Sequence, residues 1–421
     1  MYKLTKLDNK IELITAPLTD SQTVTVLVMV KVGSRHESAS LNGISHFIEH
    51  LMFKGTKKRP SSLMITKKLD GVGAEFNAFT GKEYTGYYVK VSSEHLNLAL
   101  DILSDMLFNP LFPEKEINKE RGVIIEEINM YNDNPLMLMG DVFEETLFDG
   151  HALGRRIIGP KENIQKISRN QILKYYKQHY LRGKIIVGVA GNFEQVSIKD
   201  KVNGYFGQKK LGQSSLKIDN FKSRQRSKRI NLLYRETEQV QLALGFPAVK
   251  KTSPDKYPLA VLAAVLGGNM SSRLFSQIRE KRGLAYFVKA ALETFQDTGA
   301  FVVRAGLDKT KMELALKTIL SELKKVRDKG ISQAELKMAK EFIKGKMALQ
   351  FEDSTEVISW LIEQKLLTGR IEDRQIKKNK VDQVDLKAVK KIARQIIDFK
   401  KFNLALIGPF EDKKYFEKLI K

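Results

Sequence analysis

The pattern of apolar and polar positions divides the chain into two similar halves. Residues 84–107 alternate apolar and polar side chains and then change to helical spacing, which predicts a strand followed by an amphipathic helix. Residues 299–326 show the same order in the second half, with a polar turn between the two elements. This recurrence indicates an internal repeat of about half the chain.

A second matched pair of helices follows the first pair. Residues 112–133 carry Pro113 at a predicted helix start. Residues 331–353 begin with Ser332 and Glu335 at the spacing of a capping box. In each half, a second long helix is therefore expected to follow the strand and its amphipathic helix.

The repeat predicts an α+β fold of two homologous domains, each a mainly antiparallel sheet with helices packed on one face. A chain of 421 residues fits two domains of about 200 residues better than a single core. Apolar periodicity lapses near residues 207–228, where Gly, Ser and basic residues accumulate. We expect one domain at residues 1–210, a linker at 211–228 and a second domain at 229–421.

The first candidate chemistry lies in residues 42–56, NGISHFIEHLMFKGT. Asn42 is the predicted N-cap and Gly55 the predicted C-terminal stop of a helix. On that helix His46 and His50 are four residues apart and share one face. Two imidazoles in this arrangement can bind one zinc ion.

A glutamate accompanies the two histidines. Glu49 lies three residues after His46, where its carboxylate can accept a proton from a water molecule at the metal. Histidines four apart on an apolar helix are usually packing or surface residues, and this alternative stays open for the pair alone. However, two of only six histidines fall in this window, and the order His46, Phe47, Ile48, Glu49, His50 is that of the inverzincins.

A third zinc ligand is expected on the helix containing ERGVIIEEINMY. Glu120 and Glu127 are seven residues apart, about two turns, and so lie on one face. An inward carboxylate face would be costly without a cation. The alternative is an acidic helix end on which Glu126 and Glu127 are simply solvated.

Composition excludes several classes of site and anchor. The chain has no cysteine, so disulfides, thiolate metal sites and cysteine nucleophiles are excluded. No apolar run approaches the roughly 20 residues that span a bilayer, and residues 1–17 lack the features of a signal peptide. A soluble cytoplasmic protein without a membrane span is expected.

The formal net charge of +23 has two interpretations. It could indicate affinity for nucleic acid, anionic lipid or acidic substrates. Alternatively it is a lysine-rich solvated surface, which the dispersed basic residues of segments such as ELKMAKEFIKGKM favour. The densest cluster, residues 222–229, falls in the predicted linker. We therefore expect no specific nucleic-acid partner.

The chain resembles the pitrilysin-type (inverzincin) zinc metallopeptidases, in the branch of mitochondrial processing peptidase and its small bacterial relatives. The matching stretches, which with the repeat cover essentially the whole chain, are HFIEHLMFKGT, EFNAFTGKEYTGYYVKV, ERGVIIEEINMYNDNP, LGRRIIGP and LGGNMSSRLFSQIREKRGLAY. The resemblance implies a zinc-dependent endopeptidase that hydrolyses oligopeptides or unfolded protein segments, with Glu49 as general base. It also implies that Glu127 is the third ligand and that Glu120 is a supporting carboxylate.

The resemblance assigns further residues to substrate. It implies that Arg279 and Tyr286 hold the substrate carbonyl as it becomes an oxyanion, a task that suits a cation and a phenol. Without it, they would be a surface charge and a half-buried aromatic residue. It further implies that a substrate strand pairs beside Asn77, Ala78 and Phe79, although Phe79 is as readily a core residue of a hairpin.

The second half cannot hold an equivalent zinc site. Its segment YPLAVLAAVLGG has neither histidine nor glutamate, and Ala339 and Lys346 align with Glu120 and Glu127. One zinc ion per chain is therefore expected. The resemblance implies a closed chamber formed by a homodimer, in which Arg279 and Tyr286 serve the zinc of the partner chain. The main rival is a non-catalytic scaffold subunit, against which the intact zinc motif argues.

Overall fold

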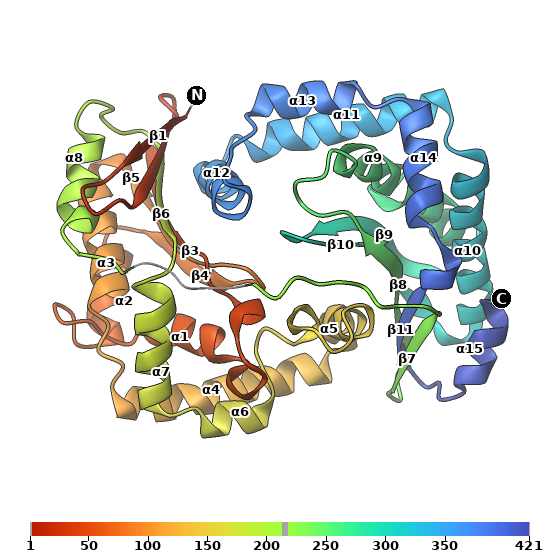
Figure 1. Cartoon of the computed structure of the whole chain (residues 1–421), viewed down its shortest axis with the longest axis horizontal. Coiled ribbons are helices and arrows are strands. Elements are labelled where there is room, and N and C mark those ends of the chain that lie inside the picture. The colour runs from red at the N-terminus through yellow and green to blue at the C-terminus, as the bar shows by residue number, and fades with distance from the viewer. Residues whose placement is uncertain (1, 213–217, 421) are drawn as a thin grey trace. The chain divides into compact units, whose positions relative to one another are not determined.

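The computed structural model describes residues 2–212 and 218–420, which fold into two compact units (Figure 1). The described parts of the first unit fall in Met1–Asn129, Arg155–Asp219 and Ala348–Ile371. Those of the second unit fall in Met130–Gly154, Asn220–Met347 and Glu372–Lys421. Each unit is a mixed sheet with helices, which confirms the predicted two-domain α+β fold.

The first unit is built on a sheet with the strand order β1-β2-β6-β3-β5-β4. Its strands are β1 (Lys3–Lys6), β2 (Glu12–Pro17), β3 (Thr23–Val30), β4 (Glu75–Thr80), β5 (Thr85–Ser92) and β6 (Ile185–Gly191). β2 and β6 pair in parallel, and the other neighbours pair antiparallel. β4 and β5 form a hairpin, and β4 is left as an edge strand.

Helices cover both faces of this sheet. They are α1 (Ile44–Met52), α2 (Ser62–Asp70), α3 (Leu96–Phe108), α4 (Glu114–Asp133, of which the first unit includes residues up to 129), α6 (Lys161–Lys166), α7 (Arg169–Tyr175), α8 (Ile198–Val202) and α12 (Ser354–Thr368). α3 packs on β3 and β5. α12 comes from the C-terminal half of the sequence and packs on β2, β3 and β6 (Figure 1).

A glycine in β6 permits the close approach of α12. A Cβ atom at Gly188 would lie 2.3 Å from Cγ1 of Ile358, a distance that real Cβ atoms essentially never show. Ile358 is fully buried in the cluster that α12 forms with Ile14 and Leu27. Gly188 is therefore required by packing, because any side chain would displace α12.

The second unit repeats this plan, with the strand order β7-β11-β8-β10-β9. Its strands are β7 (Arg229–Tyr234), β8 (Gln239–Ala248), β9 (Ala285–Thr294), β10 (Gly299–Asp308) and β11 (Asn403–Gly408). β7 and β11 are parallel, and the other neighbours are antiparallel. Its helices are α5 (Pro135–Leu147), α9 (Lys256–Gly267), α10 (Met312–Lys329), α11 (Gln333–Gln350, up to residue 347), α13 (Arg374–Asp382), α14 (Leu386–Ile396) and α15 (Lys413–Leu419).

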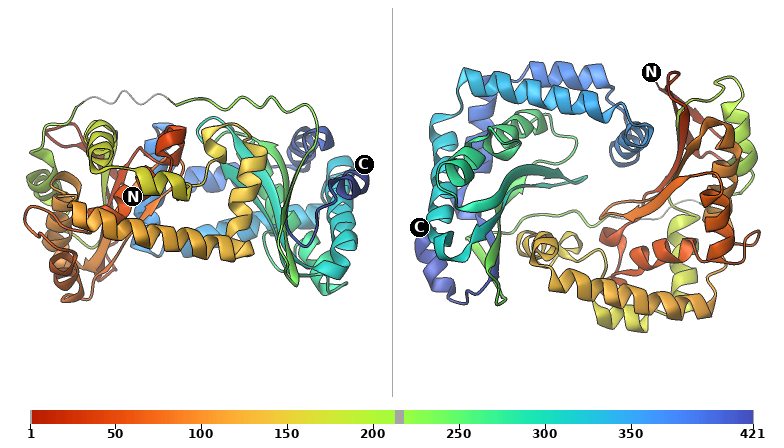
Figure 2. Two further views of the ribbon diagram at one scale, coloured as in Figure 1. Left: turned by 90° about the horizontal axis from the view of Figure 1, so that it is seen from below. Right: turned by 180° about the vertical axis from the view of Figure 1, so that it is seen from behind.

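The two faces of the second sheet also bury different helices. α9, α10 and α14 supply the large core on one face, where α10 and α14 lie side by side (Figure 2). α5, from the N-terminal half of the sequence, packs on β7, β8 and β11 on the other face. Each sheet thus receives one helix from the other half of the sequence, and helices therefore pack on both faces of each sheet rather than on the one face predicted. The predicted domain boundaries at residues 210 and 229 describe the sequence repeat and stay a prediction. The compact units follow a different division, because α5 belongs to the second unit and α12 to the first.

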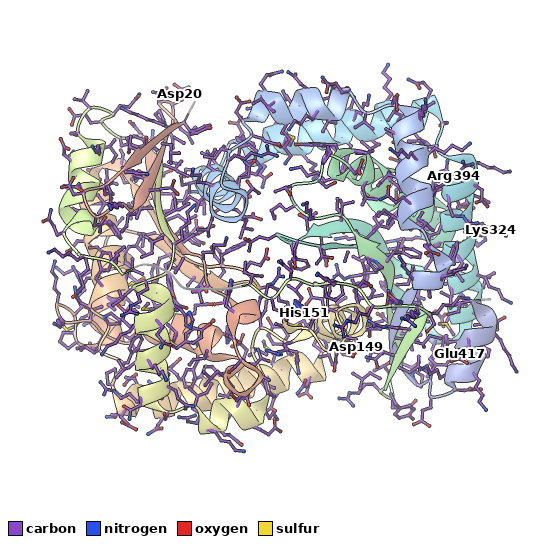
Figure 3. The ribbon with its side chains drawn as sticks, in the orientation of Figure 1. Asp20, Asp149, His151, Lys324, Arg394 and Glu417 are labelled. Atoms are coloured by element: carbon purple, nitrogen blue, oxygen red, sulfur yellow. The ribbon has the colours of Figure 1, made fainter. Side chains whose placement is uncertain are left out.

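The predicted capping box opens α11. The backbone N–H of Ser332 donates to Oε2 of Glu335 at 2.7 Å, and the N–H of Glu335 donates to Oγ of Ser332 at 3.2 Å. Basic side chains lie on exposed helix faces, as Figure 3 shows for Lys324 on α10 and Arg394 on α14. In the described ranges, no helix combines the length and the apolar character that crossing a membrane requires.

Candidate metal centre

α1 presents its two histidines opposite an apolar face. That face is buried and consists of Ile44, Phe47, Ile48, Leu51 and Met52. Its burial sets the rotation of the helix, so His46 and His50 emerge together on the other side. Their ring centroids are 4.7 Å apart.

The N-terminus of α1 is capped by a residue outside the helix. Glu37 is 4% exposed, and its Oε2 and Oε1 accept hydrogen bonds from the backbone N–H groups of Gly43 and Ser45, each at 2.8 Å. Gly43 is the N-cap, with φ 103°. The prediction that Asn42 is the N-cap is wrong, because the carboxylate of Glu37 takes that role and Asn42 donates to it at 2.8 Å. The helix ends at Met52, before Gly55.

Burial raises the pKa of Glu37, and hydrogen bonds from Asn42 and from the backbone of Ser45 and Gly43 oppose that rise. The carboxylate satisfies backbone donors that a helix N-terminus otherwise leaves unpaired. Glu37 therefore holds the start of the histidine helix in place.

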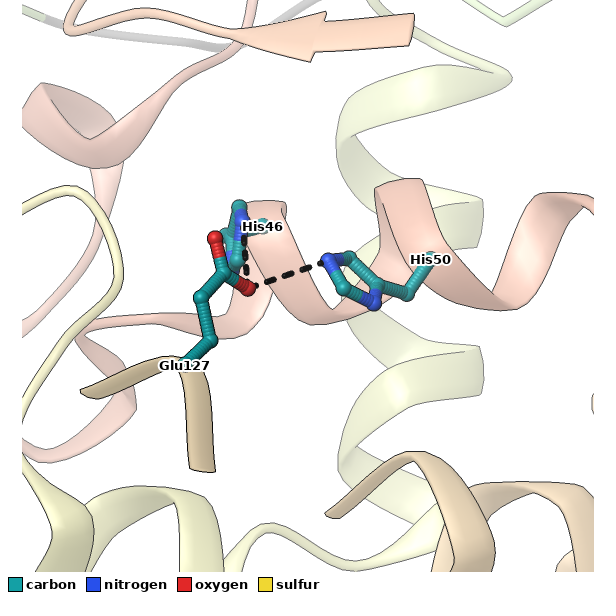
Figure 4. Close-up of side chains that lie close together, drawn as sticks. All are labelled: His46, His50 and Glu127. Atoms are coloured by element: carbon teal, nitrogen blue, oxygen red, sulfur yellow. Dashed lines mark ion pairs between the residues drawn. The ribbon is translucent and has the colours of Figure 1, made fainter. Parts of the chain in front are cut away.

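α4 brings a carboxylate to both histidines. Oε2 of Glu127 lies 3.7 Å from Nε2 of His46 and 3.5 Å from Nε2 of His50 (Figure 4). One donor atom from each of the three residues falls within 4.8 Å of the others. Glu127 is therefore not simply a solvated residue at an acidic helix end, because its carboxylate lies beside both imidazoles.

The donor set fits a zinc ion. Two ligand atoms at about 2.1 Å from one tetrahedral ion are separated by about 3.4 Å, close to the two distances observed here. Burial lowers the pKa of His46 to about 3, with a smaller contribution from His50, so its imidazole is neutral as a metal ligand requires. Burial also raises the pKa of Glu127, and the charge of His50 opposes that rise.

Glu120 contacts the ring nitrogen of His50 that faces away from Glu127. Its side chain is 3% exposed, with Oε2 at 3.3 Å from Nδ1 of His50 and Oε1 at 2.8 Å from Nζ of Lys54. Burial alone would raise the pKa of Glu120, but the hydrogen bonds from His50 and Lys54 hold it below its ordinary value. An ionised carboxylate only accepts, so Nδ1 carries the proton and Nε2 keeps its lone pair for a metal.

Glu49 lies beside the same donors and is tied to the edge strand. Oγ1 of Thr80, the last residue of β4, donates to Oε2 of Glu49 at 2.5 Å. Burial raises the pKa of Glu49, while the bond from Thr80 and the charge of His50 act in the opposite direction. The carboxyl is thus oriented by one fixed donor rather than by bulk water.

Comparison with known proteins identifies the family. Residues 13–161 match the domain described as insulinase (peptidase family M16), and residues 166–343 match the peptidase M16 inactive domain. The uncharacterized zinc protease YmxG of Bacillus subtilis (strain 168) is 36% identical over 390 residues, which cover 92% of this chain and 93% of that protein. The chain belongs to peptidase family M16.

Two further similarities support the assignment of this chain to family M16. An uncharacterized zinc protease of Streptomyces coelicolor is 34% identical over 417 residues, 97% of this chain and 90% of that protein. The crystal structure of a protease from Helicobacter pylori has a TM-score of 0.92 at 24% identity, over 97% of this chain and 99% of that one, which shows the shared fold. The predicted family, pitrilysin-type zinc proteases, is confirmed.

A pocket in the M16 chain opens beside the histidines and the edge strand. Its volume is about 300 Å³, and it is lined by Glu49, His50, Phe53, Lys54, Phe76, Asn77, Ala78 and Glu120. Two of the three predicted substrate-strand positions, Asn77 and Ala78, are in this lining. Phe79 points to the face of the sheet away from Phe76 and Ala78. There it packs with the α12 cluster, and its ring centroid lies 6.1 Å from that of Tyr84.

The second unit brings Arg279 and Tyr286 together. Nη1 of Arg279 donates to the backbone oxygen of Tyr286, and the guanidinium lies 5.2 Å from the ring centroid of Phe275. The β9–β10 register shifts here: Gly306 pairs with Phe287, but Leu307 pairs with Ala285. Tyr286 is therefore the extra residue of a β-bulge, which accounts for its 71% exposure at the edge of the sheet.

The sequence reasoning missed three supporting residues. Lys54 lies four residues after His50, so the helical spacing that found the histidines would also have found it. Thr80 ends β4, the strand beside which substrate is predicted to pair. A hydroxyl at the end of a strand is a weak signal of a functional residue. Glu37 carries no local signal, because its contact with the helix depends on the loop between them.

Proposed function

We propose that the chain is a zinc-dependent endopeptidase that hydrolyses oligopeptides or unfolded protein segments. His46, His50 and Glu127 bind one zinc ion per chain, and Glu49 is the general base. The observation that carries the proposal is the convergence of three metal donors beside Glu49 at an open edge strand. Membership of a zinc protease family supports it.

The residues of the site divide the chemistry between them. Zinc, when bound, supplies a Lewis acid that polarises a carbonyl group and makes water more acidic. Glu49 accepts the proton that the attacking water loses and delivers it to the leaving amine. Thr80 orients the Glu49 carboxyl, and Glu120 orients the ring of His50.

The substrate binds as an added strand on β4. An edge strand offers unpaired backbone groups, and backbone pairing accepts any extended peptide with little regard to sequence. Asn77 and Ala78 line the pocket at this edge, and Phe53 and Phe76 form an aromatic wall, with ring centroids 6.2 Å apart. A side chain next to the scissile bond would therefore meet an apolar surface.

Arg279 and Tyr286 complete the site by holding the substrate carbonyl. Two copies of the chain form a closed chamber, in which Arg279 and Tyr286 of one copy serve the zinc of the other. The exposed phenol of Tyr286 and its bulge support a role in binding. Mixing Glu49→Gln with Tyr286→Phe chains tests this part. Recovery of activity in the mixture is expected, and its failure would contradict sharing between copies.

The function itself is tested with a mixed library of quenched peptides. Wild type and Glu49→Gln are compared at equal measured zinc content. Hydrolysis by the wild type and its loss in the variant, with zinc retained, are expected. Equal hydrolysis in both would indicate another site, and no hydrolysis in either despite bound zinc would favour a scaffold subunit.

A further inference from the structure

A second pocket lies wholly within the second unit, at the N-terminal end of α5. Its volume is about 430 Å³, and its lining consists of Asn134, Pro135, Leu136, Thr237, Gln239, Gln241, Tyr286 and Phe287. The walls are largely apolar, and the lining contains no charged residue. An uncharged ligand group therefore suits it better than an ion.

Gln241 is the unusual member of this lining. It is 6% exposed, and its Oε1 is buried without a hydrogen-bond partner among the described residues. Its neighbours across the sheet are Gly306 on β10 and Ile407 on β11, neither of which has a polar side chain. A buried amide oxygen without a partner costs free energy, so Gln241 is retained at the expense of stability.

Gly306 keeps this corner open. A Cβ atom there would lie 2.7 Å from Cε1 of Phe287 and 3.3 Å from Oε1 of Gln241. Any other residue would push against the Phe287 ring and the Gln241 amide. The space beside the amide thus depends on a glycine in β10.

The helix end at this pocket does not offer an anion site. The N–H groups of Leu136 and Met137 are taken by Oδ1 of Asn134, at 3.1 and 3.3 Å, and Pro135 has no N–H group. Oδ1 of Asn134 therefore occupies the position that a bound anion would need. Among the described residues of the lining, Oε1 of Gln241 is left as the buried side-chain polar atom without a hydrogen-bond partner.

Tyr286 connects the pocket to an extended peptide. It lines the pocket and, as a bulge residue, is exposed on β9, the edge strand of this sheet. A peptide held at Tyr286 would place a neighbouring side chain over the pocket, where Leu136 and Phe287 would cover its apolar part. Its polar end would meet the Gln241 amide.

We propose that this pocket binds an uncharged side chain of the peptide substrate that ends in an amide or hydroxyl group, and that Gln241 selects it by a hydrogen bond. The proposal rests on the proposed function, since it assigns a substrate subsite to Tyr286. A site with a buried polar group rejects an analogue that lacks the matching partner, because the protein group is then left unpaired. Glutamine is thus favoured over methionine, and tyrosine over phenylalanine.

The test uses peptides that differ at one position, as the pairs Gln/Met and Tyr/Phe. The wild type is expected to show at least about a tenfold preference for the polar member in kcat/KM at one position. Gln241→Met is expected to abolish that preference and to raise the Tm. Gln333→Met, an exposed change elsewhere in this unit, is the matched control and should alter neither property.

A binding measurement separates this proposal from the proposed function. Affinities of labelled Gln and Met peptides are measured for the Glu49→Gln chain with and without Gln241→Met. A preference present only with Gln241 supports the subsite even if no peptide is cleaved. Equal affinities in both chains, or a Tm lowered by Gln241→Met with selectivity intact, would overturn it and assign Gln241 a structural role.

Discussion

The hydroxyl of Thr80 donates a hydrogen bond to Oε2 of Glu49 at 2.5 Å and so joins the edge strand β4 to the proposed general base. A peptide that pairs with β4 would thus bind beside a carboxyl already oriented by the same strand. The position of this carboxyl depends on the hairpin as well as on α1.

Removal of that hydroxyl should slow catalysis. Thr80→Val is expected to lower kcat about tenfold with little change in KM, because a hydrogen bond to a charged group contributes about 1.5 kcal/mol. Steady-state kinetics at equal zinc content measure it. Thr80→Ser keeps the hydroxyl and serves as the control; equal losses in both variants would mean that the methyl group, not the bond, matters.

Zinc content should distinguish neighbouring glutamates. Glu127→Gln is expected to lose stoichiometric zinc, while Glu126→Gln, an exposed change one residue away, should keep it. Glu120→Gln should retain zinc but bind it about 10- to 100-fold more weakly, because it removes a charge that supports His50. Metal analysis after dialysis and competition with a chelator measure both effects. Zinc retained by Glu127→Gln with unchanged affinity would contradict the proposed ligand set.

The cap on α1 should be important for both stability and metal affinity. Glu37→Ala leaves two backbone N–H groups without their acceptor and removes one of the two acceptors of the Asn42 amide, so unfolding should become easier by about 3 kcal/mol. Urea unfolding of the zinc-free protein measures this, and zinc titration should show weaker binding. Glu94→Ala, at an exposed glutamate in the same unit, is the comparison and should have a small effect.

A pH-dependent contribution to stability is expected from Glu335. Arg273 donates to both of its oxygens, at 2.5 and 2.8 Å, and this bonding, opposed by desolvation, lowers the pKa of Glu335 to about 2. Because the folded-state pKa lies below the unfolded value of 4.5, the stabilisation is complete above about pH 4.5 and is lost as the pH falls towards 2. The pair is partly exposed, so we expect only about 1 kcal/mol at pH 7.

The difference in unfolding free energy between wild type and Glu335→Gln, measured from pH 7 to pH 2, checks this. The difference should shrink between pH 4.5 and 2. Glu341→Gln, on the same helix but exposed and paired with Lys344, should show a smaller and flatter difference. A constant difference for Glu335→Gln across this range would exclude the carboxylate charge as the cause.

The sequence by itself determined the local elements and the pairing of the histidines. Helical geometry places residues four apart on one face wherever the helix lies, so His46 and His50 share a face before any tertiary contact forms. Apolar periodicity likewise predicted α3 and α10, since the amphipathic pattern is a property of the chain alone. The family resemblance added Glu127, which periodicity did not distinguish from a solvated residue.

Only the tertiary structure decided which distant groups meet. The cap from Glu37, the bond from Thr80 and the exchange of α5 and α12 join segments separated by loops or by whole domains. Such contacts depend on how faces pack and where a strand bulges, as at Tyr286, and these are set by the summed burial of many residues. Local periodicity specifies which face of an element is apolar, but its partner is chosen by packing in three dimensions.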